Sequence, residues 1–263
     1  MCIRDRPRTA HRIRYDVMTG PADPRFIPPG AILDYTLSAD TTEPIRLEIL
    51  DGAGSILRTF TSGPPPGTET TQGMRAPQTR PAGPAALSSK AGAHRFIWDL
   101  RHAGVPGSRG GGPMVAPGDY KIRLTMGAFT QERSLKVLSD PRLVKDNVTD
   151  AMIVEQTRLL LDIRDRVIEA RGVLQKLTEA RAAARVDTSP KGASRLKSIE
   201  GVIAKLQTAG GFYPQPMLID QFASISRMLG QADQQPGRDA YERFADLVKE
   251  LDAIKAEATT VMM

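Results

Sequence analysis

Acidic side chains are the residues of this sequence that could do acid–base chemistry. Hydrolysis of a glycosidic bond needs two carboxylates that flank a cleft, one of them with a raised pKa. The acidic residues of the second half instead recur at helical spacing with arginine or lysine three or four positions away, as Asp162 does with Arg166. We therefore expect solvated ion pairs on helix faces rather than catalytic carboxylates. The same expectation covers Asp165, Glu169, Glu242, Asp246 and Glu250.

Other reactive residue types are few. His94 and His102 stand at opposite ends of one predicted strand, too far apart to share a metal ion, and His11 lies near the N-terminus. With Cys2 as the single cysteine, neither a disulfide framework nor a thiolate zinc site can form within the chain. Gly110–Gly112 lacks the Lys-Ser/Thr of a phosphate loop, and no G-x-S-x-G turn occurs. The sequence predicts no catalytic, metal or cofactor-binding residue and no cofactor, and therefore no enzyme.

The charge distribution bears on nucleic acid and membranes. The net charge is +6, but five arginines crowd the first fourteen residues and the other charges mostly alternate in sign. A nucleic-acid interface would gather lysine and arginine on one face, so we expect no nucleic-acid partner. No apolar run approaches the roughly 20 residues that span a bilayer, so we expect no membrane insertion.

The N-terminal segment is set apart from the fold. Its first six residues, MCIRDR, resemble an adapter-derived leader seen on metagenomic reading frames. We expect residues 1–26 to be a leader and linker, and we expect upstream sequence to be missing.

The first half of the chain has the two-residue period of strands. Residues 45–49 and 120–126 alternate apolar with polar side chains, and Asp51–Gly54 is typical of a tight hairpin turn. Further strands are expected at Ala31–Ser38, Ile56–Thr61, Ala93–Arg101 and Phe129–Leu138. Short strands joined by loops alone favour an antiparallel, immunoglobulin-like β-sandwich over residues 27–140. Two polar, glycine-rich loops, Gly63–Lys90 and Ala103–Pro117, are expected to be mobile insertions that do not pack.

From Thr149 the period becomes helical. Apolar residues from Leu160 to Leu177 are spaced alternately three and four apart, with Thr149 as the N-cap. Helices are expected from Thr149 to about Arg185 and over Ala193–Thr208, Pro216–Gly230 and Arg238–Thr259, with Gly210-Gly211 ending the second. Short connections favour antiparallel neighbours, so residues 141–263 are predicted to form an antiparallel helical bundle of about four helices. The fold class is therefore α+β with segregated domains.

Two strand motifs carry a family resemblance. Residues 91–101 read AGAHRFIWDLR, and residues 116–124, after a glycine-rich loop, read APGDYKIRL. This order resembles the Ig-like module of the flagellar hook-capping protein. Over about residues 14–263, with the Asp140-Pro141-Arg142 joint, the chain is similar to the C-terminal region of bacterial secreted sortilin-like or neuraminidase-repeat β-propeller proteins, often called glycosyl hydrolases. The propeller is absent here, so no hydrolase activity transfers to any residue of the chain.

The resemblance implies a non-catalytic accessory or scaffold module of a larger secreted or periplasmic protein. Its partner would be the missing N-terminal β-propeller or another protein domain. Trp98 is expected to be a core residue between the sheets, and Tyr120 to bury its ring while its hydroxyl reaches a backbone group. The alternative is a carbohydrate- or peptide-binding module of a glycoside hydrolase-like enzyme, in which these two rings form a ligand platform. Exposed aromatic rings at a loop end would favour that alternative.

Overall fold

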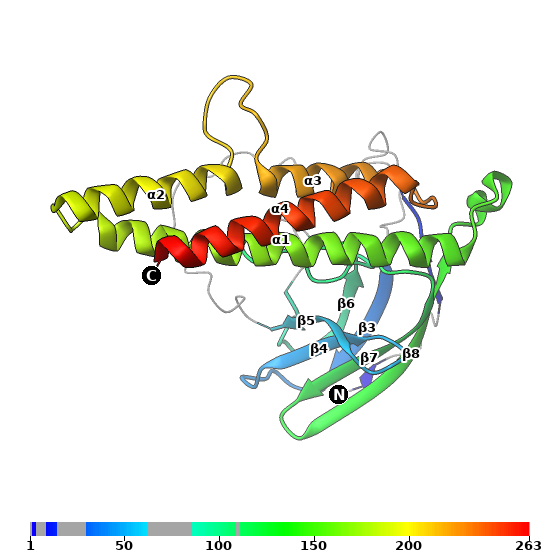
Figure 1. The fold of residues 1–263 in the computed structure, drawn as a ribbon. Coiled ribbons are helices and arrows are strands. Elements are labelled where there is room, and N and C mark those ends of the chain that lie inside the picture. Colours follow the sequence, from blue (N-terminus) through cyan, green and yellow to red (C-terminus); the bar gives the residue numbers. More distant parts are fainter. Residues whose placement is uncertain (1, 4–8, 15–29, 63–85, 109–110, 263) are drawn as a thin grey trace. The chain divides into compact units, whose positions relative to one another are not determined.

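The chain has an α+β fold in which, among the described residues, the strands precede the α-helices (Figure 1). The computed structural model describes residues 2–3, 9–14, 30–62, 86–108 and 111–262. These divide into two compact units: residues within Met1–Ala103 and Arg109–Val154, and residues within Gly104–Ser108 and Glu155–Met263. We call them the strand unit and the helical unit and describe each by itself.

The described strands of the first unit form two sheets. One sheet has the order β1-β3-β6 and the other β2-β8-β7-β4-β5. The strands are β1 (Cys2–Ile3), β2 (Thr9–Arg12), β3 (Ala31–Leu37), β4 (Ile45–Leu50), β5 (Ile56–Thr61), β6 (Gly92–Trp98), β7 (Gly118–Met126) and β8 (Phe129–Ser139). The turn between β4 and β5 is closed by Asp51, whose carbonyl accepts from Gly54 N and whose side chain accepts from Ser55 N. The strands and the hairpin predicted from the two-residue period are thus present.

The two sheets share one hydrophobic core. Along β3 every second residue is buried, so one face of the strand is apolar throughout. The cluster contains side chains of both sheets, among them Leu33, Phe96 and Trp98 of one and Ile45, Leu47, Leu124, Leu135 and Val137 of the other.

Strand β2 departs from two expectations. Thr9–Arg12 lies within the segment expected to be leader and linker, yet it pairs with β8, and Ala10 and Arg12 are buried. The pairing is parallel, so the sheet is mixed and the prediction of a purely antiparallel arrangement is wrong at this edge. Main-chain hydrogen bonds make this pairing, and they leave little trace in the side-chain pattern.

Part of the loop after β6 is buried, although the sequence predicts that Ala103–Pro117 is a mobile insertion that does not pack. Met114 and Val115 are buried, and Val115 N donates to the carbonyl of Leu100. The chain folds back on itself, since His102 N donates to Pro113 O and Gly112 N to His102 O. Its two apolar residues and its paired backbone explain the order of this part. The other predicted loop, Gly63–Lys90, lies outside the described residues from 63 to 85.

The second unit contains α1 (Asp150–Ala184) from Glu155 onward, α2 (Pro190–Leu206), α3 (Leu218–Leu229) and α4 (Arg238–Met262). A 3-10 helix, η1 (Pro141–Asp146), precedes them and is capped by Asp140, whose side chain accepts from Arg142 N. The hydroxyl of Thr149 accepts from Met152 N at 3.4 Å, as an N-cap does. Each α-helix ends within three residues of its expected bounds.

Helices α1 and α4 run parallel, which corrects the expectation of an all-antiparallel bundle. The hydroxyl of Tyr241 donates to Glu155 at 2.6 Å, and Lys255 pairs with Glu169. Both partners advance by the same number of residues along their helices, so the helices point the same way. Helix α2 is antiparallel to α4, because Arg195 bonds the carbonyl of Met262 and Lys205 pairs with Glu257.

Helices α1 and α4 are parallel because α2 and α3 together cross the helical unit only once. Figure 1 shows them following one another in the same direction, with a projecting loop between them. Gln156, at the start of α1, donates to the carbonyl of Leu229, at the end of α3. The chain therefore crosses the unit three times, and the first and third passes are parallel. All four helices contribute to one core, against which Val105 of the loop Gly104–Ser108 also packs.

Candidate interaction site

Trp98 and Tyr120 are core residues, as the first interpretation predicts. Trp98 is fully buried, and its indole N–H donates to the carbonyl of Arg101 at 3.1 Å. The Tyr120 ring meets it edge-on at 5.9 Å between centroids, and its hydroxyl donates to the carbonyl of Ala116 at 2.6 Å. Burial raises the pKa of Tyr120 to about 12. Neither ring offers a face to a ligand, so the platform expected under the alternative is not formed by these residues.

The histidines lie apart. His94 packs against the ring of Tyr35, with Nε2 2.6 Å from the carbonyl of Lys90, and His11 Nδ1 is 3.3 Å from the carbonyl of Ser139. His102 is buried, and its backbone pairs with Pro113 and Gly112. Among the described residues, no three His, Cys, Asp or Glu side chains group as metal ligands would.

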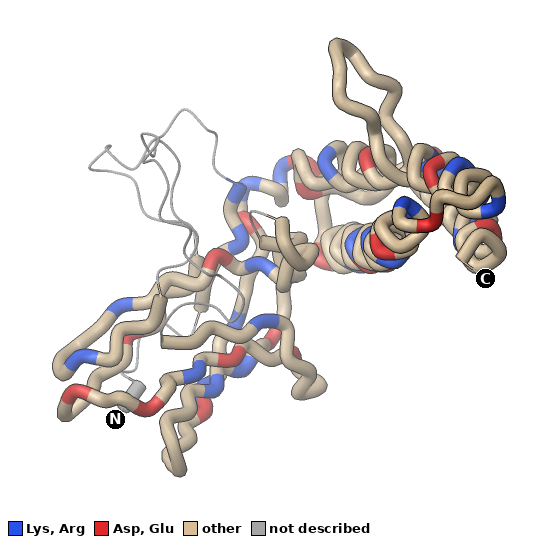
Figure 2. Tube along the Cα trace, turned by 90° about the vertical axis from the view of Figure 1, so that its left-hand side faces the viewer, with Lys and Arg blue, Asp and Glu red and all other residues tan. Residues whose placement is uncertain are grey.

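Four of the six acidic residues expected to form ion pairs on helix faces do so. Each of the four has an arginine or lysine partner within four residues, Glu169 also pairs with Lys255 of α4, and mixed charges follow the helices in Figure 2. Arg166 binds Glu169 at 2.6 Å rather than the predicted Asp162. Three further near-neighbour pairs are Asp165 with Arg164, Glu242 with Arg238 and Asp246 with Lys249.

A hollow of about 330 Å³ between α1 and α4 brings two acidic groups to one cleft. Glu155 and Asp162 line it, with Arg158 and Tyr241. Glu155 accepts the hydroxyl proton of Tyr241, and burial and this hydrogen bond raise the pKa of Tyr241 to about 12. Asp162 is exposed. A general acid needs a desolvated carboxyl group, which the exposed Asp162 does not supply.

The loop between α2 and α3 presents two aromatic rings to solvent. We call Gln207–Met217 the aromatic loop. Phe212 is 99% exposed and Tyr213 97%, the two most exposed large hydrophobic side chains among the described residues. Their rings lie 6.1 Å apart at an angle of 61°. Solvent-exposed aromatic pairs are what interaction sites commonly use, because large rings bury much apolar area on binding.

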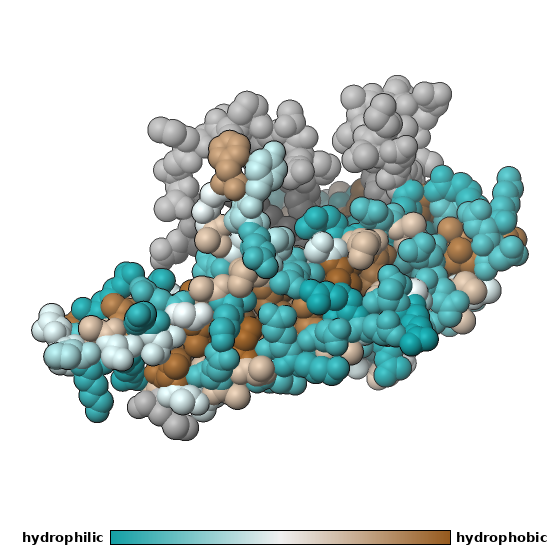
Figure 3. Space-filling model, turned by 45° about the horizontal axis from the view of Figure 1, so that its top comes forward, coloured by the Kyte–Doolittle hydropathy of each residue, from teal (hydrophilic) through white to brown (hydrophobic). Residues whose placement is uncertain are grey.

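The local sequence holds the rings away from the helices. Thr208 Oγ1 accepts from Met217 N at 2.9 Å, which closes the base of the loop. Tyr213 has φ +51° and precedes Pro214, a conformation that is costly for a non-glycine residue in this position. No residue of the loop is charged, and Figure 2 shows it without blue or red. In Figure 3 it stands out from the surface of the helical unit.

The exposure of Phe212 and Tyr213 is not predicted by the sequence analysis, in which Gly210-Gly211 only ends a helix. A signal was present: two adjacent aromatic residues lie among two glycines and two prolines, outside any periodic segment. Side chains in such a segment have no helix face through which to reach a core.

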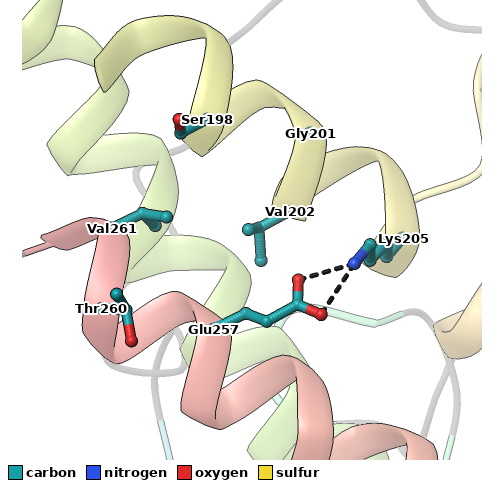
Figure 4. A pocket seen from close by; sticks show the side chains of 7 residues that line it. All are labelled: Ser198, Gly201, Val202, Lys205, Glu257, Thr260 and Val261. Carbon is teal, nitrogen blue, oxygen red and sulfur yellow. Dashed lines mark hydrogen bonds and ion pairs between the residues drawn. The ribbon is translucent and has the colours of Figure 1, made fainter. Parts of the chain in front are cut away.

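A second hollow lies beside the loop, between α2 and α4 (Figure 4). We call it the α2–α4 hollow; its volume is about 390 Å³. The Lys205–Glu257 ion pair, at 2.6 Å, forms one rim. The hydroxyls are occupied, since Ser198 donates to Ser194 O and Thr260 to Ala256 O. The lining residues are Ser198, Gly201, Val202, Lys205, Glu257, Thr260 and Val261.

The α2–α4 hollow is suited to an apolar group rather than to chemistry. Gly201, Val202 and Val261 supply apolar surface. No histidine is among the lining residues, and Ser198 is hydrogen-bonded within its own helix, so no nucleophile and base are paired here.

Comparison with known proteins adds no family to these observations. None of the described helices is both long and apolar enough to cross a membrane. The chain matches no protein-family model, and no curated protein matches it.

Proposed function

We propose that this chain is a non-catalytic accessory or scaffold module that contacts another protein through the aromatic loop. In this proposal the strand unit is an Ig-like β-sandwich and the helical unit a helix bundle, each serving as a rigid support. The observation that carries it is the complete exposure of Phe212 and Tyr213 on a closed, uncharged loop. A folded chain gains nothing from exposing two rings, whereas a binding partner can bury them.

The geometry of the pair favours a protein partner over a sugar. A sugar ring stacks flat on an aromatic face, and two rings inclined at 61° do not make one shared platform. A protein pocket can enclose both rings from several sides, as it does at interface hot spots. The absence of charge in the loop calls for an apolar pocket on the partner.

A peptide-display selection tests the proposal. A random peptide library is selected on the full chain and counter-selected on the double variant Phe212→Ser, Tyr213→Ser, with Val186→Ser as the control for an exposed apolar residue elsewhere. Apolar peptides whose affinity falls at least tenfold in the double variant alone support it. A selection that yields only peptides indifferent to the loop would overturn it.

Carbohydrate binding is the second candidate, favoured by the same exposed rings. The chain and the double variant are applied to a glycan array and to chromogenic sugar and ester substrates. Loop-dependent glycan binding would replace the protein partner with a sugar. Turnover that a single carboxylate substitution abolishes would refute the non-catalytic assignment.

Secretion or a periplasmic location, and a β-propeller as the natural neighbour, belong to this proposal through the resemblance of the two strand motifs alone. Sequencing of the genomic region upstream would test both. Propeller repeats preceded by a signal peptide support them, and an unrelated cytoplasmic domain contradicts them.

A further inference from the structure

Arg101, which follows β6 in the strand unit, is a half-buried cation. Among the described residues its guanidinium group makes one hydrogen bond, from Nη1 to the carbonyl of Gly112 at 3.1 Å, and it forms no ion pair. A guanidinium group carries several further N–H donors, so most of those of Arg101 are available to a ligand. Charged groups that are withdrawn from water are normally paired with an opposite charge.

A second guanidinium group, that of Arg58 in β5, lies beside the first. A β-carbon added to Gly111 would lie 3.0 Å from Cδ of Arg101 and 3.1 Å from Nη1 of Arg58. The two side chains therefore meet at one point, against a residue that has no side chain of its own. Nη1 of Arg58 donates to Asp99 at 2.7 Å, and among the described residues Asp99 is the one carboxylate that pairs with either arginine.

The charge at this point is positive overall. Two guanidinium groups share one carboxylate, which leaves an excess of positive charge. Burial lowers the pKa of Arg101, and the neighbouring charges of Arg14 and Arg58 lower it further. The charge of Asp99 acts in the opposite direction. An anion placed beside these groups would be attracted by the arginines more strongly than it is repelled by the single carboxylate.

We propose that Arg58 and Arg101 form a binding site for an oxyanion, and that this oxyanion is a phosphate group. Paired N–H donors of arginine match the oxygens of carboxylates and phosphates alike. A phosphate group carries a charge of about −1.5 to −2 at pH 7 and therefore suits the excess of positive charge better than a second carboxylate does. The site lies in the strand unit and goes beyond the proposed function, which concerns the aromatic loop.

The backbone of Arg101 is fixed before any ligand binds. Its N–H donates to Oδ1 of Asp99 at 3.3 Å, and its carbonyl accepts from the indole N–H of Trp98 at 3.1 Å. It also forms a β-bridge with Met114. Little ordering of the chain is then required on binding, which lowers the entropic cost of holding a small ligand.

Titration of the full chain with inorganic phosphate, followed by NMR chemical shifts at constant ionic strength, tests the site. The amides of Gly111 and Gly112 and the side-chain N–H signals of Arg58 and Arg101 should shift together and saturate, with a dissociation constant of about 1 mM. Acetate should bind at least about tenfold more weakly, because it carries a single charge.

Phenyl phosphate distinguishes two sources of the phosphate group. Binding of this ester as tight as that of inorganic phosphate identifies a phosphorylated molecule as the ligand. Exclusion of the ester identifies the free ion.

Charge variants test the residues. Arg101→Gln should weaken phosphate binding at least about fivefold, whereas Arg123→Gln, at an arginine of the same unit that pairs with both Glu48 and Glu132, should leave it unchanged. Asp99→Asn should tighten binding about threefold, because it removes the competing negative charge. An arginine that serves the fold alone would not give this gain.

A glycine variant tests the geometry without changing any charge. The β-carbon of Gly111→Ala would come within 3.0–3.1 Å of both arginine side chains and displace them, so phosphate binding should weaken. Gly52→Ala is the matched control, because its β-carbon would meet its nearest atom at 3.7 Å, an ordinary contact.

Three results would overturn the proposal: shifts that do not saturate up to about 20 mM phosphate, binding that Arg101→Gln and Gly111→Ala both leave unchanged, or acetate bound as tightly as phosphate. The last result would assign the site to a carboxylate. Failure here is distinct from failure of the proposed function, because selection of loop-dependent peptides does not involve these arginines.

Discussion

Replacing Tyr120 with phenylalanine should destabilise the strand unit at neutral pH and cease to do so in alkali. Tyr120→Phe keeps the buried ring and removes the hydroxyl that donates to the carbonyl of Ala116 at 2.6 Å. A lost hydrogen bond that leaves a half-buried carbonyl without its donor costs about 1–2 kcal/mol. We expect the free energy of unfolding at pH 8 to fall by that amount.

The pH dependence follows from the raised pKa of the phenol. The pKa of Tyr120 is about 12 in the folded chain, against about 10 in an unfolded one. Because the pKa is higher in the folded chain, the contribution of the protonated Tyr120 to the free energy of unfolding is complete below pH 10. It is lost as the pH rises toward 12. By pH 11 the ionisation of Tyr120 should have lowered the free energy of unfolding of the wild type by about 1.4 kcal/mol. The variant has no group that ionises at this position, so the free energies of unfolding of the two proteins should become nearly equal.

Trp98 supplies the assay for this prediction. It is the single tryptophan of the chain, and its ring lies 5.9 Å from that of Tyr120. Urea unfolding of both proteins, followed by Trp98 fluorescence at several pH values from 8 to 11, yields the two free energies. A difference that does not change with pH, or a variant as stable as the wild type at pH 8, would refute the burial and bonding of this hydroxyl.

Three further substitutions test other parts of the account. Gln156→Ala leaves the carbonyls of Leu229 and Ala232 without their donor at a fully buried position. Urea unfolding followed by far-UV circular dichroism should therefore show that the free energy of unfolding falls by about 2–4 kcal/mol. A fall of less than about 0.5 kcal/mol would contradict these hydrogen bonds. Lys205→Ala removes an ion pair whose side chains are nearly half exposed, and the free energy of unfolding should change by less than about 1 kcal/mol; a larger loss would mean that this pair holds the helices together. The pKa of Asp140 is lowered, first of all by its hydrogen bond to the side chain of Arg142, so its stabilisation is present above its unfolded pKa and is lost as the pH falls. Asp140→Asn should therefore flatten the acid limb of the stability profile, and an unchanged limb would contradict the pairing.

The elements could be predicted from sequence because their signals are local. The last two helices begin where a helical period starts, the first three end near prolines, glycines or polar turn residues, and all four end within three residues of expectation. Trp98 and Tyr120 were predicted to be core residues because strand alternation places their side chains on buried positions.

The arrangement of the elements could not be predicted in the same way. Helix spacing gives the apolar face but not the direction of a neighbour, and the single pass made by α2 and α3 turns α1 and α4 parallel. The pairing of β2 with β8 depends on backbone groups that every residue carries. The exposure of Phe212 and Tyr213 runs against the general tendency of such residues to be buried, so residue type alone predicts the opposite.

The free energy of unfolding of the double variant Phe212→Ser, Tyr213→Ser tests the central claim most directly. If the two rings serve a partner and not the fold, their removal should change the free energy of unfolding of the dilute chain by less than about 0.5 kcal/mol. Phe222→Ser, at a fully buried position of the same unit, is the positive control. It should lower the free energy of unfolding by at least about 3 kcal/mol. A loss above about 2 kcal/mol in the double variant would mean that the rings pack against their own chain, and the claim of an exposed contact loop would fail.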